Sequence, residues 1–512
     1  MNKRLDNIKL NIGESEKKLL KIAAKSLGRE VKYFKIVKKS LDARDKGNIF
    51  WLYSIAFSDE EEEVFPSPEK LKTPPSVVVI GSGPAGLFCA LRLVERGFRP
   101  IIIERGESVE DRRKTTQKFF DERILNENSN VQFGEGGAGT FSDGKLNTQT
   151  HGGFNGEVLK LFHKFGAPEE ILYLNKPHIG SDILYNVLKN IRAFIEANGG
   201  RYLFNTRFTG FTQTNGALEA IKLKNTVTGE ESELNVNYAV AALGHSARDT
   251  FLTLSEAGIK MEPREFAIGV RIEHLASEIG LAQYGKNYKC LPTADYKLVS
   301  HVHERTVFTF CMCPGGVVIP ASSEEGGVVT NGMSLFSRGG QNSNSALMVQ
   351  MKKEDFGSDD LFAGMRFQRE IERRAYNAAG GNYSAPVQLY RDFAVDKVSS
   401  GFGTVKPTYS VGTAFVPLGE ILPSVAVDAL KAAIPDMNRR LKGFASPDAV
   451  LTGVETRFSS PLKILRGESG ESVSLRGFYP CGEGSGYSGG ITSSAADGLK
   501  IAEKIYEKCK NH

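Results

Sequence analysis

Cysteine is scarce in this chain, and its spacing excludes whole classes of protein. The 512 residues contain 6 cysteines, and no two of them form a C-x-x-C pair. Cysteine and histidine also do not gather at the spacing of a zinc site. We therefore predict neither a bound metal nor a disulfide framework.

Long apolar runs are absent as well. No stretch of eighteen apolar residues occurs, so no membrane-spanning helix is expected. The first residues lack the apolar core of a secretory signal, which makes a cytoplasmic location the expectation. With 40% hydrophobic and 24% charged residues, the composition is typical of a soluble globular protein, and the length predicts two or three domains. The net charge of +5 favours no class of partner and defines no oligomeric state.

The first fifty residues differ from the rest in charge. They hold 14 Lys and Arg against 6 Asp and Glu. A short strand at Lys9–Ile12, helical spacing over Glu14–Leu27 and further β-rich stretches at Tyr33–Val37 and Ile49–Phe57 predict a small α+β domain over residues 1–70. The acidic run Asp59–Glu63 then indicates a linker. The basic surface is either a solvated face of an accessory domain or a binding face for nucleic acid or an acidic partner.

The segment Ser76–Glu104 predicts a dinucleotide site. Its sequence, SVVVIGSGPAGLFCALRLVERGFRPIIIE, runs in the order strand, glycine turn, helix, strand and acid. Such a unit can hold a pyrophosphate at the N-terminus of its helix. A lone G-x-G-x-x-G is weak evidence, but here every accompanying feature stands in order.

Each glycine of this turn has its own role. Gly81 allows a sharp turn, Gly83 lets the backbone approach a phosphate, and Gly86 allows the helix to pack closely on the strand. Glu104 can accept hydrogen bonds from ribose hydroxyls and disfavours a 2′-phosphate. The predicted contacts to the nucleotide half are Gly81, Ser82, Gly83, Pro84, Ala85, Gly86, Glu104 and Arg105.

A second glycine-rich turn lies near the C-terminus. The strand Phe478–Cys481 leads into GEGSGYSGGI at Gly482–Ile491, and a helix follows. The carboxylate of Glu483 can accept hydrogen bonds from a ribityl chain. The helix dipole can favour negative charge on the N1/O2 edge of a flavin. Alone this turn is equally compatible with an ordinary helix cap, but paired with the first turn it predicts FAD.

The order of strands and helices predicts how the chain is divided. From Ser76 strands and helices alternate, as in a doubly wound sheet. Arg201–Thr206, Phe208–Gln213 and Leu218–Asn225 predict a β-meander, and Asn235–Leu243 predicts a strand that ends at Gly244. The predicted units are an accessory domain at 1–70, the first part of an FAD-binding domain at 75–263, an inserted substrate domain at 264–445 and the second part of the FAD-binding domain at 446–512.

Several segments together resemble the glutathione-reductase-like FAD superfamily and, within it, the uncharacterised bacterial FAD-dependent (NAD/FAD-utilising) dehydrogenases. These are GEGGAGTFSDGKL at 134–146, FCMCPGG at 310–316, TNGMS at 330–334, TGVETRFSSP at 452–461 and GEGSGYSGGI at 482–491. The resemblance implies an α/β fold with a Rossmann-like FAD-binding domain built from both ends of the chain. It also implies an inserted β-rich α+β substrate domain, beside the small N-terminal α+β domain. Glu483 departs from the pattern, because many members carry Asp there.

The resemblance also implies which residues line the flavin. The segment at 134–146 should run along the ribityl and isoalloxazine side, and the lack of cysteine between Cys89 and Cys290 excludes the disulfide relay found there in some members. The further contacts implied are Gly137, Ser142, Lys145, Leu146, Phe208, Gly244, Gly482, Glu483, Gly489, Gly490 and Ile491.

Four residues are candidates for the chemistry itself. Cys311 and Cys313 form a C-x-C pair that can hold a reducible disulfide or present a thiolate, or they are two buried packing residues. On a strand their side chains would share a face. Arg457 can fix a carboxylate or an anionic flavin, or it forms a structural ion pair with Glu455. Tyr487 can cover the flavin or donate a proton.

These patterns predict an FAD-dependent oxidoreductase that transfers hydride between the flavin and an unidentified small organic substrate. One alternative is a flavoprotein that binds or modifies nucleic acid such as tRNA through its basic N-terminal domain. Another is a flavin redox sensor. Only one dinucleotide fingerprint is present, so NADH or NADPH would act at most as a transient reductant.

Overall fold

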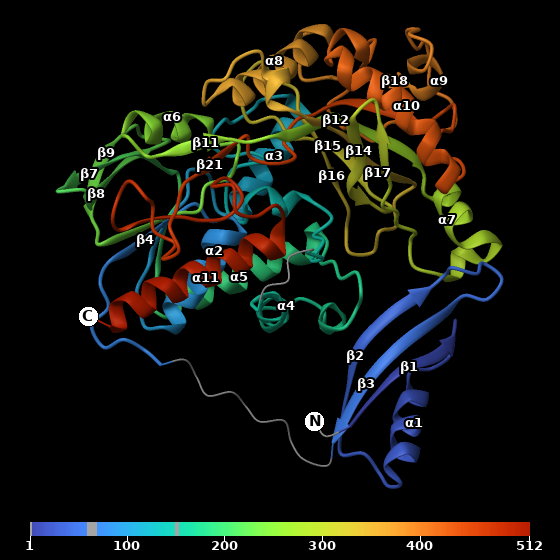
Figure 1. Cartoon of the computed structure of the whole chain (residues 1–512), viewed down its shortest axis with the longest axis horizontal. Coiled ribbons are helices and arrows are strands. Elements are labelled where there is room, and N and C mark those ends of the chain that lie inside the picture. Colours follow the sequence, from blue (N-terminus) through green and yellow to red (C-terminus); the bar gives the residue numbers. More distant parts are fainter. Residues whose placement is uncertain (1–2, 59–68, 149–152, 512) are drawn as a thin grey trace.

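The chain folds into a small N-terminal domain and a larger body (Figure 1). The computed structural model describes residues 3–58, 69–148 and 153–511. The predicted acidic linker Asp59–Glu63 lies outside these residues. Within the described ranges, no helix has both the length and the apolar character needed to cross a membrane.

The N-terminal domain is a three-stranded antiparallel sheet with one helix. Its strand order is β1-β3-β2, and Leu19 and Ala23 of the helix pack against Tyr53, Ile55 and Phe57 of the central strand. The expected helix and three strands are thus present. Their bounds are β1 (Lys3–Asn11), α1 (Lys17–Leu27), β2 (Tyr33–Asp42) and β3 (Phe50–Ser58).

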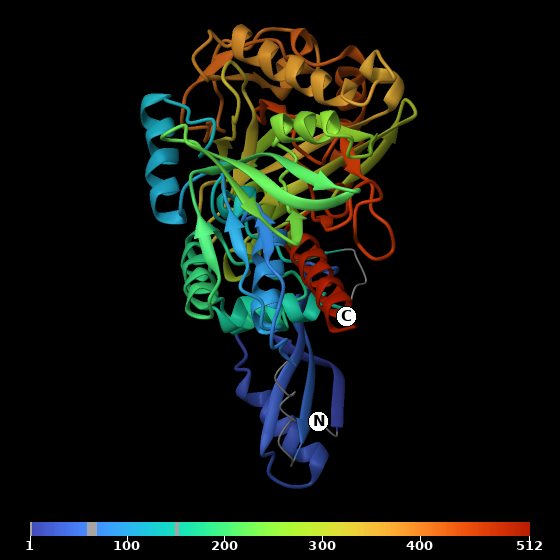
Figure 2. The ribbon, with the colours of Figure 1, turned by 90° about the vertical axis from the view of Figure 1, so that its left-hand side faces the viewer.

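This domain contacts the body along one edge. The amide of Lys39 in β2 donates to the carbonyl of Tyr173 at 2.8 Å, and the Lys39 carbonyl accepts from the amide of Asn175 at 2.9 Å. The Nζ of Lys46 donates to the carbonyl of Ala282 at 2.7 Å. Figure 2 shows the domain extending below the rest of the molecule.

The body contains a five-stranded parallel sheet built from both ends of the chain. Its order is β22-β10-β4-β5-β6, so a strand from the last forty residues forms one edge. The strands β4 and β5 are short and apolar, as expected for strands that are covered on both faces. The bounds are β4 (Val77–Ile80), β5 (Ile101–Ile103), β6 (Arg201–Leu203), β10 (Tyr238–Ala241) and β22 (Phe478–Pro480).

Two helices from opposite ends of the chain lie side by side on this sheet. They are α2 (Pro84–Glu95) and α11 (Ile491–Lys510), which Figure 1 shows in contact. A Cβ on Gly498 of α11 would stand 2.1 Å from the carbonyl oxygen of Ala85. Only glycine permits this approach, because real Cβ atoms do not come so close to backbone oxygen.

The β-meander differs from the sequence expectation at its boundaries. Arg201–Thr206 was expected as its first strand, but β6 is the edge of the parallel sheet, where it continues from β5. The meander is instead β7, β8 and β9. The turn between the first two has positive φ at both Asn215 and Gly216, the geometry of a two-residue hairpin. The bounds are β7 (Thr206–Thr214), β8 (Ala217–Asn225) and β9 (Glu231–Asn235).

The inserted region forms a seven-stranded sheet of order β13-β14-β17-β12-β20-β18-β19. All its pairs are antiparallel except β18 with β19. The strand β20 belongs to this sheet although it follows residue 445, so we propose a boundary after β20 in place of the predicted one. The bounds are β12 (Phe266–Leu275), β13 (Val299–Val302), β14 (Arg305–Cys313), β17 (Asn342–Met351), β18 (Ala385–Leu389), β19 (Thr413–Phe415) and β20 (Val450–Glu455).

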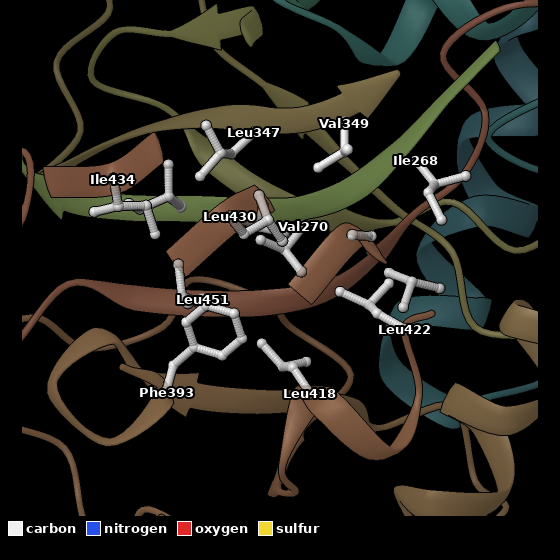
Figure 3. Close-up of a cluster of buried hydrophobic side chains, with 14 of the residues drawn as sticks. Ile268, Val270, Leu347, Val349, Phe393, Leu418, Leu422, Leu430, Ile434 and Leu451 are labelled. Carbon is white, nitrogen blue, oxygen red and sulfur yellow. The ribbon is translucent and has the colours of Figure 1, made fainter. Parts of the chain in front are cut away.

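One face of this sheet carries the largest apolar core. Figure 3 shows Leu430 and Ile434 of helix α10 lying over Val270, Leu347 and Leu451 of the sheet. All five are fully buried.

The helices of the body besides α2 and α11 are α3 (Val109–Glu122), α4 (Asn155–Lys164), α5 (Ser181–Ala197), α6 (Arg248–Glu256), α7 (Ala276–Tyr284), α8 (Ala363–Ala378), α9 (Tyr390–Phe393) and α10 (Ser424–Arg440). The remaining strands are β11 (Met261–Pro263), β15 (Val317–Pro320), β16 (Thr330–Met333) and β21 (Leu462–Ile464).

Candidate functional site

Three strands of the parallel sheet end level with one another. Ala241 of β10 pairs with Ile80 of β4 on one side and with Pro480 of β22 on the other. The segments that follow are the first glycine turn, the Gly244 segment and the second glycine turn. Ligands of doubly wound sheets bind at this carboxyl edge, so the structure brings both predicted turns to one place.

The first glycine turn has the predicted geometry. Gly81 has a φ of +100°, and a Cβ there would stand 2.5 Å from the carbonyl oxygen of Ala242. A Cβ on Gly86 would stand 1.9 Å from the carbonyl oxygen of Gly81, so helix α2 packs as closely as expected. A Cβ on Gly83 would stand 3.8 Å from the Cα of Gly137, an ordinary contact distance. The turn is therefore tight on its inner side and has more room at Gly83.

Glu104 connects this turn to the next loop. The amide and hydroxyl of Ser82 donate to its Oε2 at 3.0 and 2.7 Å. The amides of Gly106 and Gly134 donate to Oε1 at 3.0 and 3.1 Å. These four bonds occupy the acceptor positions of the carboxylate. A ribose hydroxyl would therefore take the place of the Ser82 hydroxyl, which can rotate away.

Two predicted contact residues are engaged elsewhere. Arg105 donates to Asp249 at 2.8 Å and lies over the ring of Phe133. Phe208 is buried in an apolar cluster with Ile80 and Ile103. Their side chains therefore stabilise the surroundings of the parallel sheet.

The loop at 134–146 is held by a buried arginine that the sequence did not reveal. The guanidinium of Arg112 donates to the carbonyls of Asn130, Val131 and Glu135 at 2.8, 3.0 and 2.6 Å. A Cβ on Gly134 would collide with its side chain. The loop is thus fixed from helix α3, whose polar sequence gave no sign of an inward-facing charge.

The end of this loop is joined to helix α11. The hydroxyl of Thr492 donates to the carbonyl of Leu146 at 2.7 Å. Gly137 lies against Gly83, where a Cβ would be 3.1 Å from the Gly83 Cα. Ser142 donates its hydroxyl to the carbonyl of Gly139 at 2.7 Å. The structure therefore brings the predicted loop residues between the two glycine turns.

Lys145 faces the inserted domain from this loop. Its Nζ lies 3.1 Å from a carboxylate oxygen of Asp143, which Arg338 of the inserted domain also contacts. Burial opposes ionisation of Asp143, yet Lys145 and Arg338 hold the pKa of this carboxyl below its usual range. The ion pairs thus join the loop to the inserted domain.

The second glycine turn is held by Asp497 of helix α11. Its Oδ2 accepts from the amide of Gly482 at 2.9 Å, and Arg466 donates to both of its carboxylate oxygens. The Tyr487 hydroxyl donates to the carbonyl of Ile464 at 2.9 Å and accepts from the amide of Arg466 at 3.0 Å. The Tyr487 ring also stacks on the guanidinium of Arg466. Tyr487 therefore stabilises the turn, and its hydroxyl proton is already used in the hydrogen bond to the Ile464 carbonyl.

A buried histidine at the same edge lacks partners. His245 is 8% exposed, and neither ring nitrogen makes a hydrogen bond. Its Nδ1 lies 3.5 Å from a carboxylate oxygen of Glu483. The sequence offered only one indication that His245 belongs to the site, namely that it directly follows Gly244. A buried imidazole without partners costs about 1–3 kcal/mol, which a ligand with polar groups can offset.

The residues at this edge fit FAD. The N-cap residues of α2 and α11 are Gly83 and Gly490, and neither helix has a side-chain cap. The amides of the first turns, from Ala85 onward in α2 because Pro84 has no N–H, are therefore available to an anionic ligand. A Cβ built on Gly244 or Gly489 would meet no atom within 4 Å, which leaves space in front of both. With the orphaned His245, the edge offers amide donors, open space and unpaired polar atoms.

The two candidate cysteines do not form a disulfide. A β-bulge between Phe310 and Cys313 and a φ of +40° at Cys311 interrupt the strand. Cys311 is therefore exposed while Cys313 is buried, and the expectation of a shared face is wrong. Burial raises the pKa of the Cys313 thiol, so this thiol is protonated at neutral pH.

Arg271 organises the polar side of this sheet. It is fully buried and donates to the carbonyl of Cys311 at 3.0 Å, to the Sγ of Cys313 and to Asn344. Its NH1 lies 3.4 Å from the carboxylate of Glu455. Burial raises the pKa of Glu455, although Arg271 opposes that rise. Arg271 was not a predicted site residue.

Arg457 pairs with Glu372 of helix α8, and the predicted pair with Glu455 is wrong. Its Nε and NH2 donate to the two carboxylate oxygens of Glu372 at 2.7 and 3.0 Å. Arg248 of helix α6 donates to the same oxygens, at 2.9 Å each. Burial opposes ionisation of Glu372, yet the two guanidinium groups hold its pKa well below the usual range. Arg457 thus belongs to an ion network between the two parts of the body.

Family models match three segments of the chain. Residues 76–113 match an FAD binding domain, residues 265–458 match the C-terminal domain of FAD-dependent proteins, and residues 1–58 match a domain of unknown function. The fold, the two glycine turns and these matches define a flavoprotein that binds FAD. No NAD(P)H-binding domain is among these matches.

A protein of Clostridium beijerinckii, described as an uncharacterized protein, is 44% identical over 533 residues. The match covers 99% of this chain and 98% of that protein. The chain belongs to the same family as this relative. The description of that relative assigns neither a cofactor nor a reaction.

Solved structures resemble the chain only distantly. The flavin-dependent brominase Bmp2 is 13% identical with a TM-score of 0.39, over 86% of this chain and 80% of its own. A geranylgeranyl bacteriochlorophyll reductase-like protein of Thermoplasma acidophilum is 11% identical with a TM-score of 0.39, over 86% and 79%. A glycerol-3-phosphate dehydrogenase of Bacillus halodurans complexed with FAD is 11% identical with a TM-score of 0.39, over 86% and 66%. Likeness at this level carries no argument about the reaction.

Proposed function

We propose that the chain is an FAD-dependent oxidoreductase that transfers hydride between the flavin and a small organic substrate held by the inserted domain. The observation that carries the proposal is the level ending of β4, β10 and β22. It brings the two glycine turns, nearly four hundred residues apart in the sequence, to one edge of the sheet. We also propose membership of the glutathione-reductase-like superfamily and of its uncharacterised FAD-dependent dehydrogenases.

The residues of the chain would share the work of binding. The amides at the start of α2 would bind the pyrophosphate, and Glu104 the ribose. His245 and Glu483 would bind the ribityl hydroxyls, and the start of α11 would face the N1/O2 edge. FAD, when bound, supplies hydride chemistry at its isoalloxazine ring. The protein supplies orientation and electrostatics, and Lys145 and Cys311 would face the substrate side.

Binding of FAD is tested first. Stripped protein is titrated with FAD, and the quenching of flavin fluorescence gives the dissociation constant. We expect His245→Ala to weaken binding by roughly tenfold, because it removes both ring nitrogens from the ribityl contact. Cys290→Ser, an exposed site on the inserted domain, is the control and should not change the constant. Protein that takes up no FAD overturns the proposal.

The reaction is tested on the loaded protein without oxygen. NADH, NADPH and a panel of small alcohols, amines and acids are mixed with it in turn, and the loss of the visible flavin band identifies the donor. Reduction by an organic substrate, with turnover when an electron acceptor is added, supports the proposal. A flavin that is reduced but turns over no compound would support the redox sensor instead.

A further inference from the structure

The N-terminal domain is attached to a short segment of the body, residues 173–180. Lys39 of β2, an edge strand of the domain, forms a parallel bridge with Leu174. The Lys39 amide donates to the Tyr173 carbonyl at 2.8 Å, and the Lys39 carbonyl accepts from the Asn175 amide at 2.9 Å. The segment thus extends the three-stranded sheet by one residue pair. We call residues 173–180 the strap.

The same strap holds the loop at 134–146, which lies between the two glycine turns. The amide of Leu146 donates to the Pro177 carbonyl at 3.0 Å. The amide of Ile179 donates to the Gly144 carbonyl, also at 3.0 Å. These two bonds flank an antiparallel bridge between the strap and the loop. The strap therefore joins the N-terminal domain to the candidate flavin site.

Leu146 is held from two sides. Its amide is bonded to the strap, and its carbonyl accepts from the Thr492 hydroxyl in the first turn of α11 at 2.7 Å. Asn175 and Pro177 are two residues apart, so at most about 7 Å separates their Cα atoms. The contact with the N-terminal domain is therefore close to the contact with the loop. A displacement of the strap at Asn175 would reach Leu146 and the start of α11 directly.

The two ends of the strap differ in how firmly the body supports them. At the far end, Pro177 and Ile179 are buried, and the Nε2 of His178 forms a hydrogen bond with the Phe336 carbonyl at 2.9 Å. At the near end, Asn175 is exposed. Exposed connecting segments are mobile unless other contacts hold them. The position of the near end therefore depends on its contacts with the neighbouring domains.

Further contacts connect the N-terminal domain, the strap and the inserted domain. Lys176 of the strap pairs with Asp295 at 2.8 Å, and the Gln283 side chain donates to the Asp295 carbonyl at 2.8 Å. Lys46, in the loop between β2 and β3, donates to the carbonyl of Ala282 in helix α7. Figure 1 shows this loop below α7. The N-terminal domain thus contacts both the strap and the inserted domain.

We propose that the N-terminal domain is a clamp that helps the protein to retain FAD, by holding residues 143–146 through the strap. The proposal rests on the FAD site proposed above, and it gives the domain a role that does not depend on the reaction. A site that is held in its binding geometry before the ligand arrives loses less conformational entropy on binding. Release of the clamp should therefore weaken FAD binding without removing any residue that touches FAD.

The first test removes one hydrogen bond of the clamp. Asn175→Pro in the full-length protein deletes the amide that donates to Lys39, because proline has no N–H. We expect the dissociation constant of FAD, measured by fluorescence quenching, to rise by roughly twofold to tenfold. Amide hydrogen exchange at Leu146 and Ile179 should rise with it. Asn175→Ala is the matched control, since it keeps the amide, and it should change neither quantity.

The second test releases the whole domain. Ile55 is fully buried in the core of the N-terminal domain, so Ile55→Asp should unfold this domain while the body keeps its own apolar cores. We expect a larger rise in the dissociation constant of FAD than in Asn175→Pro. The visible circular dichroism of the FAD that still binds should also change, because it reports the surroundings of the flavin. Ile55→Val keeps the core apolar and should restore the wild-type values.

These outcomes separate the clamp from the FAD site itself. Wild-type protein that takes up no FAD overturns this proposal together with the proposed function. Wild-type affinity for FAD in both Asn175→Pro and Ile55→Asp overturns the clamp alone. A rise in exchange at Leu146 that leaves the dissociation constant unchanged also overturns it, as does an equal loss of affinity in Asn175→Ala.

Discussion

At the scale of single residues, Glu135 is a buried acid that is only partly compensated. Its Oε2 accepts from the amide of Val109 at 2.8 Å and from Arg192 at 2.9 Å, while Oε1 has no hydrogen-bond partner. Burial raises the pKa of this carboxyl to about 7, although Arg192 opposes that rise. Glu135 follows Gly134 directly, so the energetic cost of burying this carboxyl falls on the loop beside the proposed flavin site.

The raised pKa predicts a pH dependence of stability. Between pH 4.5 and about 7 the folded protein holds a proton on Glu135 that the unfolded chain has released. The free energy of unfolding therefore falls as pH rises through this window, by up to about 3 kcal/mol. Glu135→Gln should remove that fall, measured by urea unfolding at several pH values.

Glu110→Gln is the matched control for this prediction. Glu110 pairs with the same Arg192, but Arg192 holds the pKa of Glu110 below its usual value against the effect of burial. Removing it disturbs the same guanidinium without removing a raised pKa. A decline in stability with pH that persists in Glu135→Gln, as in Glu110→Gln, would contradict the assignment to Glu135.

Residue types at the site could be predicted better than residue partners. The glycines of the first turn have the expected geometry, because a G-x-G-x-x-G turn constrains the backbone locally. The partners of Arg457 and Tyr487 come from α8 and β21, and nothing in the local sequence indicates those neighbours. Arg112, Arg271 and His245 were missed for the same reason. A buried charge is recognised by what surrounds it, which a single sequence does not display.

At the scale of elements, the contact between α2 and α11 depends on one glycine. A Cβ on Gly498 would stand 2.1 Å from the Ala85 oxygen and 3.0 Å from the Cys89 amide nitrogen. Neither is a flexible side chain that can move aside. The two helices that begin at the flavin site therefore keep their spacing through Gly498.

Gly498→Ala should force these helices apart. We expect a loss of about 1–3 kcal/mol in the free energy of unfolding and weaker FAD binding, because both helix N-termini shift. Thermal unfolding and FAD titration measure the two effects. Gly156→Ala in helix α4 is the control, since a Cβ there meets no atom within 4 Å. The control should stabilise by about 0.5–1 kcal/mol through helix propensity, and equal behaviour of the two variants would refute the close-packing argument.

Elements with strong local signals were predicted well. The strands β4 and β5, helix α2, the Asn215-Gly216 turn and helix α11 have the expected positions, because each has an apolar period or a glycine that fixes it. The strand expected over Asn235–Leu243 is present as the shorter β10, while its first residue, Asn235, ends β9 in a different sheet. Periodicity marks an extended segment but does not tell which sheet it joins. For that reason β6 was also expected in the meander.

At the scale of the whole molecule, one carboxylate joins the two parts of the body. Glu372 of α8 lies between Arg248 of α6 and Arg457, and the Thr456 hydroxyl donates to it at 2.6 Å. Glu324 also accepts from Arg248, at 2.8 Å, and pairs with Arg369. The inserted domain is thereby fixed relative to the parallel sheet by buried charges as well as by apolar packing.

Glu372→Gln should loosen this interface. The substitution leaves Arg457 buried without a carboxylate partner, a change that costs about 3–5 kcal/mol. Amide hydrogen exchange in α6 and α8 should rise together, and thermal unfolding should begin earlier. Glu370→Gln on the same helix removes only an exposed pair with Arg374 and should cost less than about 0.5 kcal/mol. Unchanged exchange in α6 would show that the interface does not depend on Glu372.

The parallel sheet that is closed by β22 imposes an order on biosynthesis. As the chain leaves the ribosome, β4, β5, β6 and β10 emerge long before residue 478. Until the final strand and α11 emerge, the edge strand β10 and helix α2 lack their neighbours. Because the proposed FAD site uses both glycine turns, we expect FAD to be retained only after the final strand and α11 have emerged. A prematurely terminated chain would be distinguished from the finished protein by the lack of bound FAD.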